Sequence, residues 1–187
     1  MLQEVVTQQH FSEKSFSKDN FSKERFLIEE LNRAIDLNKE NPQAQTYMML
    51  PVGEMQLLDR IVSLSEDGGK YGRGEIIAEF DIHPDLWFFK CHFPGDPIMP
   101  GCLGIDALWQ TLGFFLASQG HSGKCRALGV TDVKFGGEIL PSTSMVQFHV
   151  NVKRIIQRGM TLAIGDGTVL ADGQEIYSAK NLKAALI

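Results

Sequence analysis

The sequence predicts an α+β fold in which one long apolar helix packs among five or six antiparallel strands. Apolar side chains within residues 101–118 cover every face of a helix, which is typical of a helix buried on all sides. Short β-rich runs separated by glycine-containing turns lie before and after that segment. Because a sheet does not leave such a helix exposed, we expect the strands to wrap around it.

Composition and charge suit a single globular domain within the 187 residues, of which 43% are hydrophobic. The net charge of -5 does not indicate a nucleic-acid or anionic-membrane surface. Cys91, Cys102 and Cys125 are odd in number and lack C-x-x-C spacing, which argues against a disulfide framework and a zinc site. The chain has no signal-peptide pattern, and the apolar run 103–117 is too short to span a bilayer. We expect a cytoplasmic protein without metal or cofactor.

The first 46 residues are polar and charged and are predicted to form an N-terminal arm with one amphipathic helix. Ser22 can cap that helix, and apolar residues near 3.6 periodicity continue it through Leu37. Asn41–Pro42 ends it, because a residue before proline disfavours the α conformation. Residues 47–187 are predicted to be the main domain.

That domain is predicted to begin with a β-hairpin, formed by Met55–Leu64 and Tyr71–Ile82 around a turn at residues 66–69. The following loop, residues 83–100, contains four prolines and should be stiff. Pro100–Gly101 suits the start of the buried helix, which should end near Ser118, before Gly120. Further strands are predicted at residues 126–135, 144–156, 160–170 and 174–182.

Two side chains near the start of this helix are candidates for acid/base chemistry. Asp106 lies within the apolar helix, where a carboxylate must be hydrogen-bonded, lose its charge, or cost several kcal/mol by rough reckoning. His92 lies in the proline-framed loop just before it. An unexplained buried acid is a site candidate. The structural alternative is that Asp106 is paired, for instance to a backbone amide, and that His92 is an ordinary loop histidine.

A series of short motifs begins around these residues and continues through the rest of the domain. The motifs are Trp87–Phe89, Cys91–Phe93, Gly95–Pro97, Met99–Gly104, Asp106–Gln110, Arg126–Val130, Val133–Phe135, Lys153–Ile155, Asp172–Gly173 and Tyr177. Together they resemble the bacterial β-hydroxydecanoyl-[acyl-carrier-protein] dehydratase/isomerase family, which consists of hot-dog-fold enzymes of type II fatty acid synthesis. The resemblance covers about residues 54–187, whereas the segment before Glu54 is longer than in the family and lacks its glycines.

The resemblance implies a homodimer with two active sites at the subunit interface. His92 would be the catalytic histidine from one subunit, and Asp106 the catalytic acid from the other. The backbone N–H of Gly101 would bind the thioester carbonyl. Because a sister dehydratase without isomerase activity has glutamate where Asp106 stands, the aspartate favours the bifunctional branch.

The chemistry of dehydration explains these residue types. A β-hydroxyacyl thioester loses water when a base takes the proton beside the carbonyl while an acid protonates the departing hydroxyl. Histidine titrates near neutrality, and a carboxyl in an apolar setting can stay protonated. The N-terminus of the helix at Gly101 offers N–H groups to the developing enolate oxygen. The isomerisation, in which His92 would remove a γ-proton to give a cis-3 product, is implied by the resemblance alone.

Further site residues are predicted from the same resemblance. Phe93 and Trp109 could line an acyl tunnel, or could belong to the core, as aromatic residues often do. Basic residues stand where the family meets the acidic acyl carrier protein and its phosphopantetheine arm, although a basic strand is often only a solvated face. These residues are Lys153, Arg154, Arg158 and Lys183.

Two alternative functions fit the same pattern. The first is a hydratase or dehydratase that acts on CoA thioesters or in a secondary lipid pathway, without isomerase activity. The second, from another class, is a non-catalytic acyl-binding or scaffold protein. The joint presence of a base, an acid and an oxyanion glycine favours the dehydratase.

Overall fold

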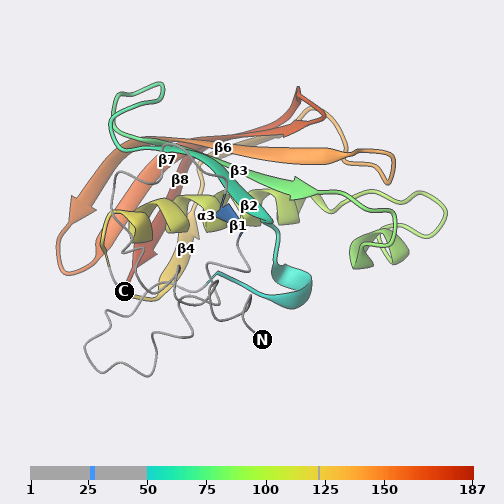
Figure 1. The fold of residues 1–187 in the computed structure, drawn as a ribbon, viewed down its shortest axis with the longest axis horizontal. Coiled ribbons are helices and arrows are strands. Elements are labelled where there is room, and N and C mark those ends of the chain that lie inside the picture. Colours follow the sequence, from blue (N-terminus) through green and yellow to red (C-terminus); the bar gives the residue numbers. More distant parts are fainter. Residues whose placement is uncertain (1–25, 28–49, 122) are drawn as a thin grey trace, which may run out of the picture.

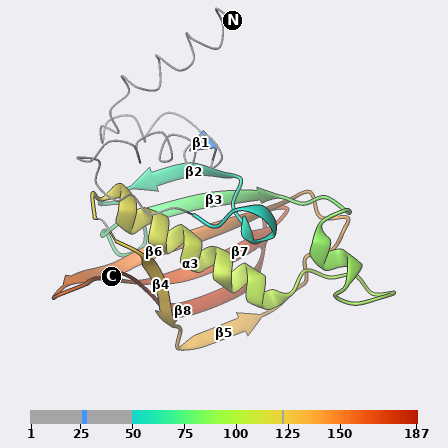
Figure 2. The ribbon, with the colours of Figure 1, turned by 90° about the horizontal axis from the view of Figure 1, so that it is seen from below.

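The strands form one antiparallel sheet with the long helix lying across one of its faces (Figures 1 and 2). The computed structural model describes residues 26–27, 50–121 and 123–187. Within these residues the sheet has eight strands in the order β1-β2-β3-β6-β7-β8-β4, and β5 pairs with β8 beside this path. The α+β class is therefore confirmed. The elements are β1 (Phe26–Leu27), η2 (Gly53–Met55), β2 (Arg60–Ser65), β3 (Glu75–Asp81), η3 (Trp87–Lys90), α3 (Gly101–Ser118), β4 (Cys125–Gly129), β5 (Asp132–Phe135), β6 (Met145–Gln157), β7 (Thr161–Ala171) and β8 (Gln174–Leu186).

The predicted hairpin and helix are both confirmed. β2 and β3 pair antiparallel, with Ile61 opposite Ala78, and α3 has the bounds expected from its flanking proline and glycine. No helix among the described residues is long and apolar enough to cross a membrane.

The predicted strand at 126–135 is wrong in one respect, because it is divided into β4 and β5. Both parts pair with β8, but β4 meets residues 183–186 and β5 meets residues 177–180. Between these two stretches Asn181 has a positive φ of 51°, which interrupts the regular ladder of β8. A break in the partner strand thus separates the two strands.

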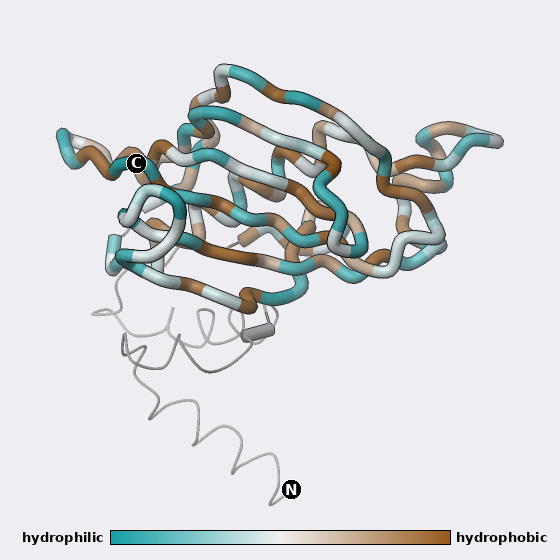
Figure 3. Tube along the Cα trace, turned by 90° about the horizontal axis from the view of Figure 1, so that it is seen from above, coloured by the Kyte–Doolittle hydropathy of each residue, from teal (hydrophilic) through white to brown (hydrophobic). Residues whose placement is uncertain are grey.

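The core lies between the inner face of the sheet and α3. Alternate side chains of β6, among them Val146, Phe148 and Val150, are fully buried, and Leu108 and Leu112 of α3 are equally buried. Figure 3 shows the alternation of hydrophobic and hydrophilic residues along the strands. Each buried side chain of this size contributes about 1.5–3 kcal/mol of hydrophobic free energy. This burial fixes the position of α3, and with it the position of Asp106.

The prediction of an N-terminal helix is wrong where the structure tests it. Phe26 and Leu27 form the short strand β1, which pairs antiparallel with Ile61 and Arg60 of β2. Backbone hydrogen bonds offered by an edge strand compete with local helix formation and decide the conformation of these two residues. The rest of the predicted arm and helix, and the boundary at residue 46, lie outside the described residues.

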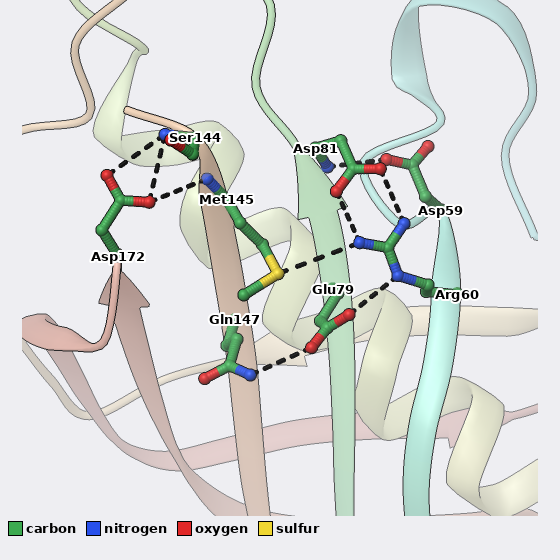
Figure 4. Close-up of polar contacts among 8 residues, drawn as sticks. All are labelled: Asp59, Arg60, Glu79, Asp81, Ser144, Met145, Gln147 and Asp172. Atoms are coloured by element: carbon green, nitrogen blue, oxygen red, sulfur yellow. Dashed lines mark hydrogen bonds and ion pairs between the residues drawn. The ribbon is translucent and has the colours of Figure 1, made fainter. Parts of the chain in front are cut away.

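The outer face of the sheet carries a charged network that joins β2, β3 and β6 (Figure 4). Glu79 is only 2% exposed, and it accepts hydrogen bonds from Arg60 at 2.7 Å and from Gln147 at 3.0 Å. The guanidinium of Arg60 also binds the carboxylate of Asp81. The backbone N–H of Asp81 in turn donates a hydrogen bond to the carboxylate of Asp59 at 2.7 Å. Burial raises the pKa of Asp59, against the effect of that N–H donor. The network neutralises the buried negative charge of Glu79 and links β2, β3 and β6 by side-chain hydrogen bonds.

Candidate active site

The segment between β3 and α3 projects beyond the sheet at the end where α3 begins (Figures 1 and 2). Backbone hydrogen bonds hold His92 within this segment: its N–H donates to Phe88 O at 2.8 Å, and its carbonyl accepts from Ile98 N–H at 2.8 Å. Phe93 and Asp96 exchange two backbone hydrogen bonds of 3.0 Å across the turn between them. The proline-rich loop is therefore held as a defined structure around His92.

The ring of His92 is oriented by its own loop. Nδ1 lies 3.1 Å from the carbonyl oxygen of Ile98. Because a carbonyl oxygen only accepts, this hydrogen bond requires the proton on Nδ1 in the neutral ring and leaves a lone pair on Nε2. Nε2 has no hydrogen-bond partner among the described residues, and the ring of Phe93 packs against the imidazole with centroids 4.0 Å apart. His92 is thus arranged to accept a proton at Nε2.

Asp106 lies in the second turn of α3 and is half-buried. Cys102, Asp106 and Trp109 follow one another at helical spacing on one face and are less buried than most of the helix. The expectation of a helix buried on all sides is therefore wrong for this face, because the sheet of this chain covers α3 from one side. The carboxylate Oδ2 accepts a hydrogen bond from Gln110 Nε2 at 2.8 Å. A side-chain amide, rather than the backbone amide considered above, is the observed partner.

His92 and Asp106 are carried by neighbouring segments, the loop and the helix that follows it. No hydrogen bond or ion pair joins them in the described part of this chain. The sharing of one site between two subunits stays a prediction.

Gly101 is the first residue of α3, as predicted for the residue that offers its N–H to the thioester. The N-cap residue Pro100 makes no side-chain hydrogen bond to the first turn. A Cβ on Gly101 would lie 2.7 Å from Cε1 of Phe135, so a larger residue would require this exposed ring to shift. The close contact favours glycine here, and the role of its N–H stays a prediction.

The two aromatic residues predicted for the acyl tunnel differ in their surroundings. Phe93 is 52% exposed and contacts His92, whereas Trp109 is half-buried and packs against the core. The indole Nε1 of Trp109 is buried and has no acceptor within the described chain. The role of both residues as tunnel walls stays a prediction.

The basic residues predicted to meet a carrier protein also divide into two groups. Arg154 and Arg158 are exposed, and Lys183 is half-buried. Lys153 is engaged within the protein: its Nζ lies 2.6 Å from Asp166 Oδ1 and 2.8 Å from Asn181 Oδ1. An exposed cation is available to a partner, whereas Lys153 would have to give up an existing ion pair.

Asp166 is a feature that the sequence reasoning missed. It is 8% exposed and accepts hydrogen bonds from Tyr71 Oη at 2.7 Å and from the backbone N–H of Asn181 at 3.0 Å, in addition to its ion pair with Lys153. Burial acts to raise the pKa of Asp166, but these donors together hold the pKa well below its ordinary value. The sequence signal for this feature is one acidic residue between Gly165 and Gly167 in a strand that has no other charged residue.

Gln110, which donates a hydrogen bond to Asp106, is the second residue that the sequence reasoning missed. Its position four residues after Asp106 was the available signal, because residues i and i+4 of a helix are neighbours.

Among the described residues, no group of three or more histidine, cysteine or acidic side chains could hold a metal ion.

The fold is shared with solved structures of low sequence identity. One is the dehydratase heterocomplex ApeI:P from Xenorhabdus doucetiae, with 13% identity, a TM-score of 0.56, and coverage of 73% of this chain and 86% of that chain. Another is a putative thioesterase from Shewanella oneidensis, with 15% identity, a TM-score of 0.50, and coverage of 85% and 98%. The antiparallel sheet with its single packed helix is a hot-dog fold.

Within the hot-dog fold class, a match to a sequence family identifies the family of this chain. Residues 50–180 match the model of the FabA-like domain, and the chain belongs to that family. The matched region includes His92, Gly101 and Asp106.

Proposed function

We propose that this protein dehydrates β-hydroxyacyl thioesters carried on acyl carrier protein to trans-2-enoyl thioesters. The observation that carries the proposal is the orientation of His92, whose Nδ1 is tied to the Ile98 carbonyl so that Nε2 presents a lone pair. Membership in the FabA-like family supports the choice of a thioester substrate.

Each step of the reaction has a candidate group. Nε2 of His92 takes the proton from the carbon beside the thioester carbonyl, and the electron pair of that C–H bond forms the new carbon–carbon double bond. Asp106 gives a proton to the β-hydroxyl group, the C–O bond breaks, and water leaves. The thioester oxygen gains negative charge on the way, and the N–H of Gly101 at the start of α3 stabilises it. Proton exchange with water then restores both side chains.

The proposed enzyme is a homodimer in which Asp106 meets His92 of a second subunit. Two features support this. The face of α3 that bears Asp106 is left partly uncovered by its own sheet. Apolar side chains near the beginning of α3 and along β4 and β5 are exposed in the single chain. They are Phe93 (52%), Leu128 (49%), Phe135 (57%) and Leu140 (40%). A second copy that covered them would also complete the surroundings of Asp106.

The proposed partner is an acidic carrier protein that delivers the acyl chain on phosphopantetheine. Arg154 and Arg158 are exposed cations on a chain whose net charge is -5, which makes them suited to steering an acidic partner. Lys183 belongs to the same proposed surface, whereas Lys153 is already paired with Asp166.

We expect the double substitution Arg154→Ser with Arg158→Ser to raise KM for a carrier-bound substrate about 10-fold at low salt and to leave kcat unchanged, because steering acts on encounter rather than on chemistry. Steady-state rates measured against salt concentration check this, since the defect should shrink as salt rises. A short thioester without carrier should be used equally well by both proteins. Arg73→Ser, at another exposed arginine, is the matched control. An unchanged KM in the double variant would remove these residues from the carrier surface.

Product analysis with a ten-carbon β-hydroxyacyl carrier substrate tests the function as a whole. The expected product is the trans-2-enoyl thioester, and an additional cis-3 product would establish the isomerase activity. Turnover of the CoA thioester alone would support the hydratase alternative. Binding of the thioester without turnover would support the acyl-binding alternative, and release of free acid would contradict the dehydration reaction.

A further inference from the structure

His149 lies in the middle of β6 on the outer face of the sheet, because its neighbours Phe148 and Val150 point inward and are fully buried. Its partners across the strands are Ile77 of β3 and Thr168 of β7, so neither residue opposite it carries a charge. The imidazole is half-buried, and its Nε2 is fully buried without a hydrogen-bond partner among the described residues. The proposed reaction gives this histidine no role.

The polar residues on one side of His149 are already bonded to one another. Gln147, two positions earlier on the same face, donates a hydrogen bond to Glu79, and Glu79 also binds Arg60 (Figure 4). The buried charge of Glu79 is thus compensated by Arg60, and His149 takes no part in this network.

The residues on the other side of His149 are bonded as well. Asn151, two positions later, accepts a hydrogen bond from the backbone N–H of Lys70 at 2.6 Å. Asp166, which stands opposite Asn151 on β7, is paired with Lys153 at 2.6 Å. His149 therefore lies between two bonded groups of polar residues.

One further charge acts on His149 from β3. Glu75 stands opposite Asn151, so it is diagonal to His149, and its carboxylate favours the protonated ring. Glu75 makes no hydrogen bond to Nε2, which stays unpartnered in the described part of the chain.

Protonation of the ring changes what the buried nitrogen requires. The neutral imidazole has one N–H, which Nδ1 can carry, and Nε2 is then an unused acceptor. The imidazolium has an N–H on both nitrogens, so a donor would be buried at Nε2 without an acceptor. Burial accordingly lowers the pKa of His149, although the charge of Glu75 acts in the opposite direction.

We propose that His149 makes the sheet sensitive to acid: the fold accommodates its neutral ring better than its cation, and protonation favours separation of β6 from β3 and β7. This inference does not depend on the dehydratase function. Phe148 and Val150, on either side of His149, belong to the core against which α3 packs. Loosening of β6 at His149 would therefore also weaken the support of that helix.

The direction of the effect follows from where each state takes up its proton. The unfolded chain protonates His149 near the ordinary pKa of 6.5, whereas the folded chain does so at lower pH. The folded protein is therefore not penalised well above about pH 6.5, and it loses stability as the pH falls toward the folded pKa.

The test removes the titrating ring. His149→Gln keeps a polar side chain whose amide oxygen can occupy the buried position of Nε2. Urea unfolding of both proteins between about pH 8 and pH 5 gives the ratio of their unfolding constants. We expect the native protein to unfold more readily relative to the variant as the pH falls, by about 3- to 10-fold in total. A ratio that stays within about twofold over this range overturns the proposal.

His83→Gln is the matched control, because His83 is an exposed histidine outside the strands. Its unfolding constant should keep a constant ratio to the native one. If His83→Gln changed the pH dependence as much as His149→Gln does, the effect would not belong to the buried nitrogen, and the proposal would fail.

An NMR titration of the His149 ring in the native protein covers the case in which His149→Gln does not fold. The expected midpoint lies below the ordinary value of 6.5. A midpoint at or above that value overturns the proposal, because the folded protein would then bind the proton at least as well as the unfolded chain.

Discussion

Replacing His92 by alanine or Asp106 by asparagine is expected to lower the rate of dehydration by at least about 100-fold, the usual contribution of a general acid or base. The ring of His92 makes one hydrogen bond, to the carbonyl of Ile98, and Asp106 is half-buried, so each variant should fold. His92→Ala removes the lone pair that accepts the proton, and Asp106→Asn removes the group that donates one. Absorbance of the conjugated enoyl thioester measures the rate, and circular dichroism checks the fold.

His83→Ala is the control for the first substitution, because His83 is an exposed histidine at the start of the same loop. It should keep the native rate. Near-native turnover in His92→Ala or Asp106→Asn would contradict the acid/base mechanism.

Mixing the two inactive variants tests whether each site is shared between subunits. If each site is shared, a dimer that contains one chain of each kind has one site with both native groups and one site with neither. Subunit exchange should therefore restore part of the activity. Failure to do so, in a dimer shown to exchange its chains, would place His92 and Asp106 of one chain in the same site.

The regular parts of the fold could be predicted because local patterns determine them. Pro100–Gly101 and the glycine after Gln119 set the ends of α3. The alternation of Val146, Phe148 and Val150 identified β6 and its inner face. In the same way, the unusual placement of Asp106 in an apolar helix was visible in the sequence.

The features that could not be predicted depend on contacts between distant residues. The division of β4 from β5 is caused by the backbone of Asn181 in another strand. Lys153 looked like a free surface cation because its partner Asp166 is on β7, brought next to it only by strand pairing. The exposure of the Asp106 face depends on how far one sheet extends around α3, which no local pattern encodes.

We expect Asp166→Asn to destabilise the protein by about 3 kcal/mol, the scale observed when one partner of a buried ion pair is removed. The side chain of Asp166 is 10% exposed, and its carboxylate accepts hydrogen bonds from Tyr71 Oη and the N–H of Asn181. It also pairs with the ammonium of Lys153 at 2.6 Å and, more distantly, with that of Lys180 at 3.4 Å. Asparagine keeps the shape but leaves Lys153 without its counter-charge. Urea unfolding at pH 7 measures the loss, and a difference below about 0.5 kcal/mol, the usual range for surface substitutions, would contradict it.

The contribution of Asp166 should also depend on pH in a definite direction. The pKa of Asp166 in the folded protein is held below the ordinary value of 3.8 by its hydrogen-bond donors, against the opposing effect of burial. A group with a lowered folded pKa contributes stability that is fully present above its unfolded pKa and is lost as the pH falls toward the folded pKa. The stability difference between the native protein and Asp166→Asn should therefore be constant above about pH 5 and narrow below about pH 4. If the stability difference between the native protein and Asp166→Asn became larger as the pH falls, the pKa of Asp166 could not be lowered in the folded protein.

A double-mutant cycle shows whether the ion pair itself, rather than the loss of a polar group, causes the effect. Asp166→Ala leaves Lys153 without its carboxylate partner, and Lys153→Met leaves Asp166 with only the longer ion pair to Lys180 at 3.4 Å. The double variant removes both charges of the short pair. The double variant should therefore be more stable than the sum of the single losses predicts, by about 1–3 kcal/mol. Arg154→Met, at the exposed neighbour of Lys153, should show no such coupling with Asp166→Ala. Additive losses for Lys153 and Asp166 would mean that Tyr71, Asn181 and Lys180 compensate the buried carboxylate without Lys153. Lys153 could then meet a carrier protein at no cost to stability.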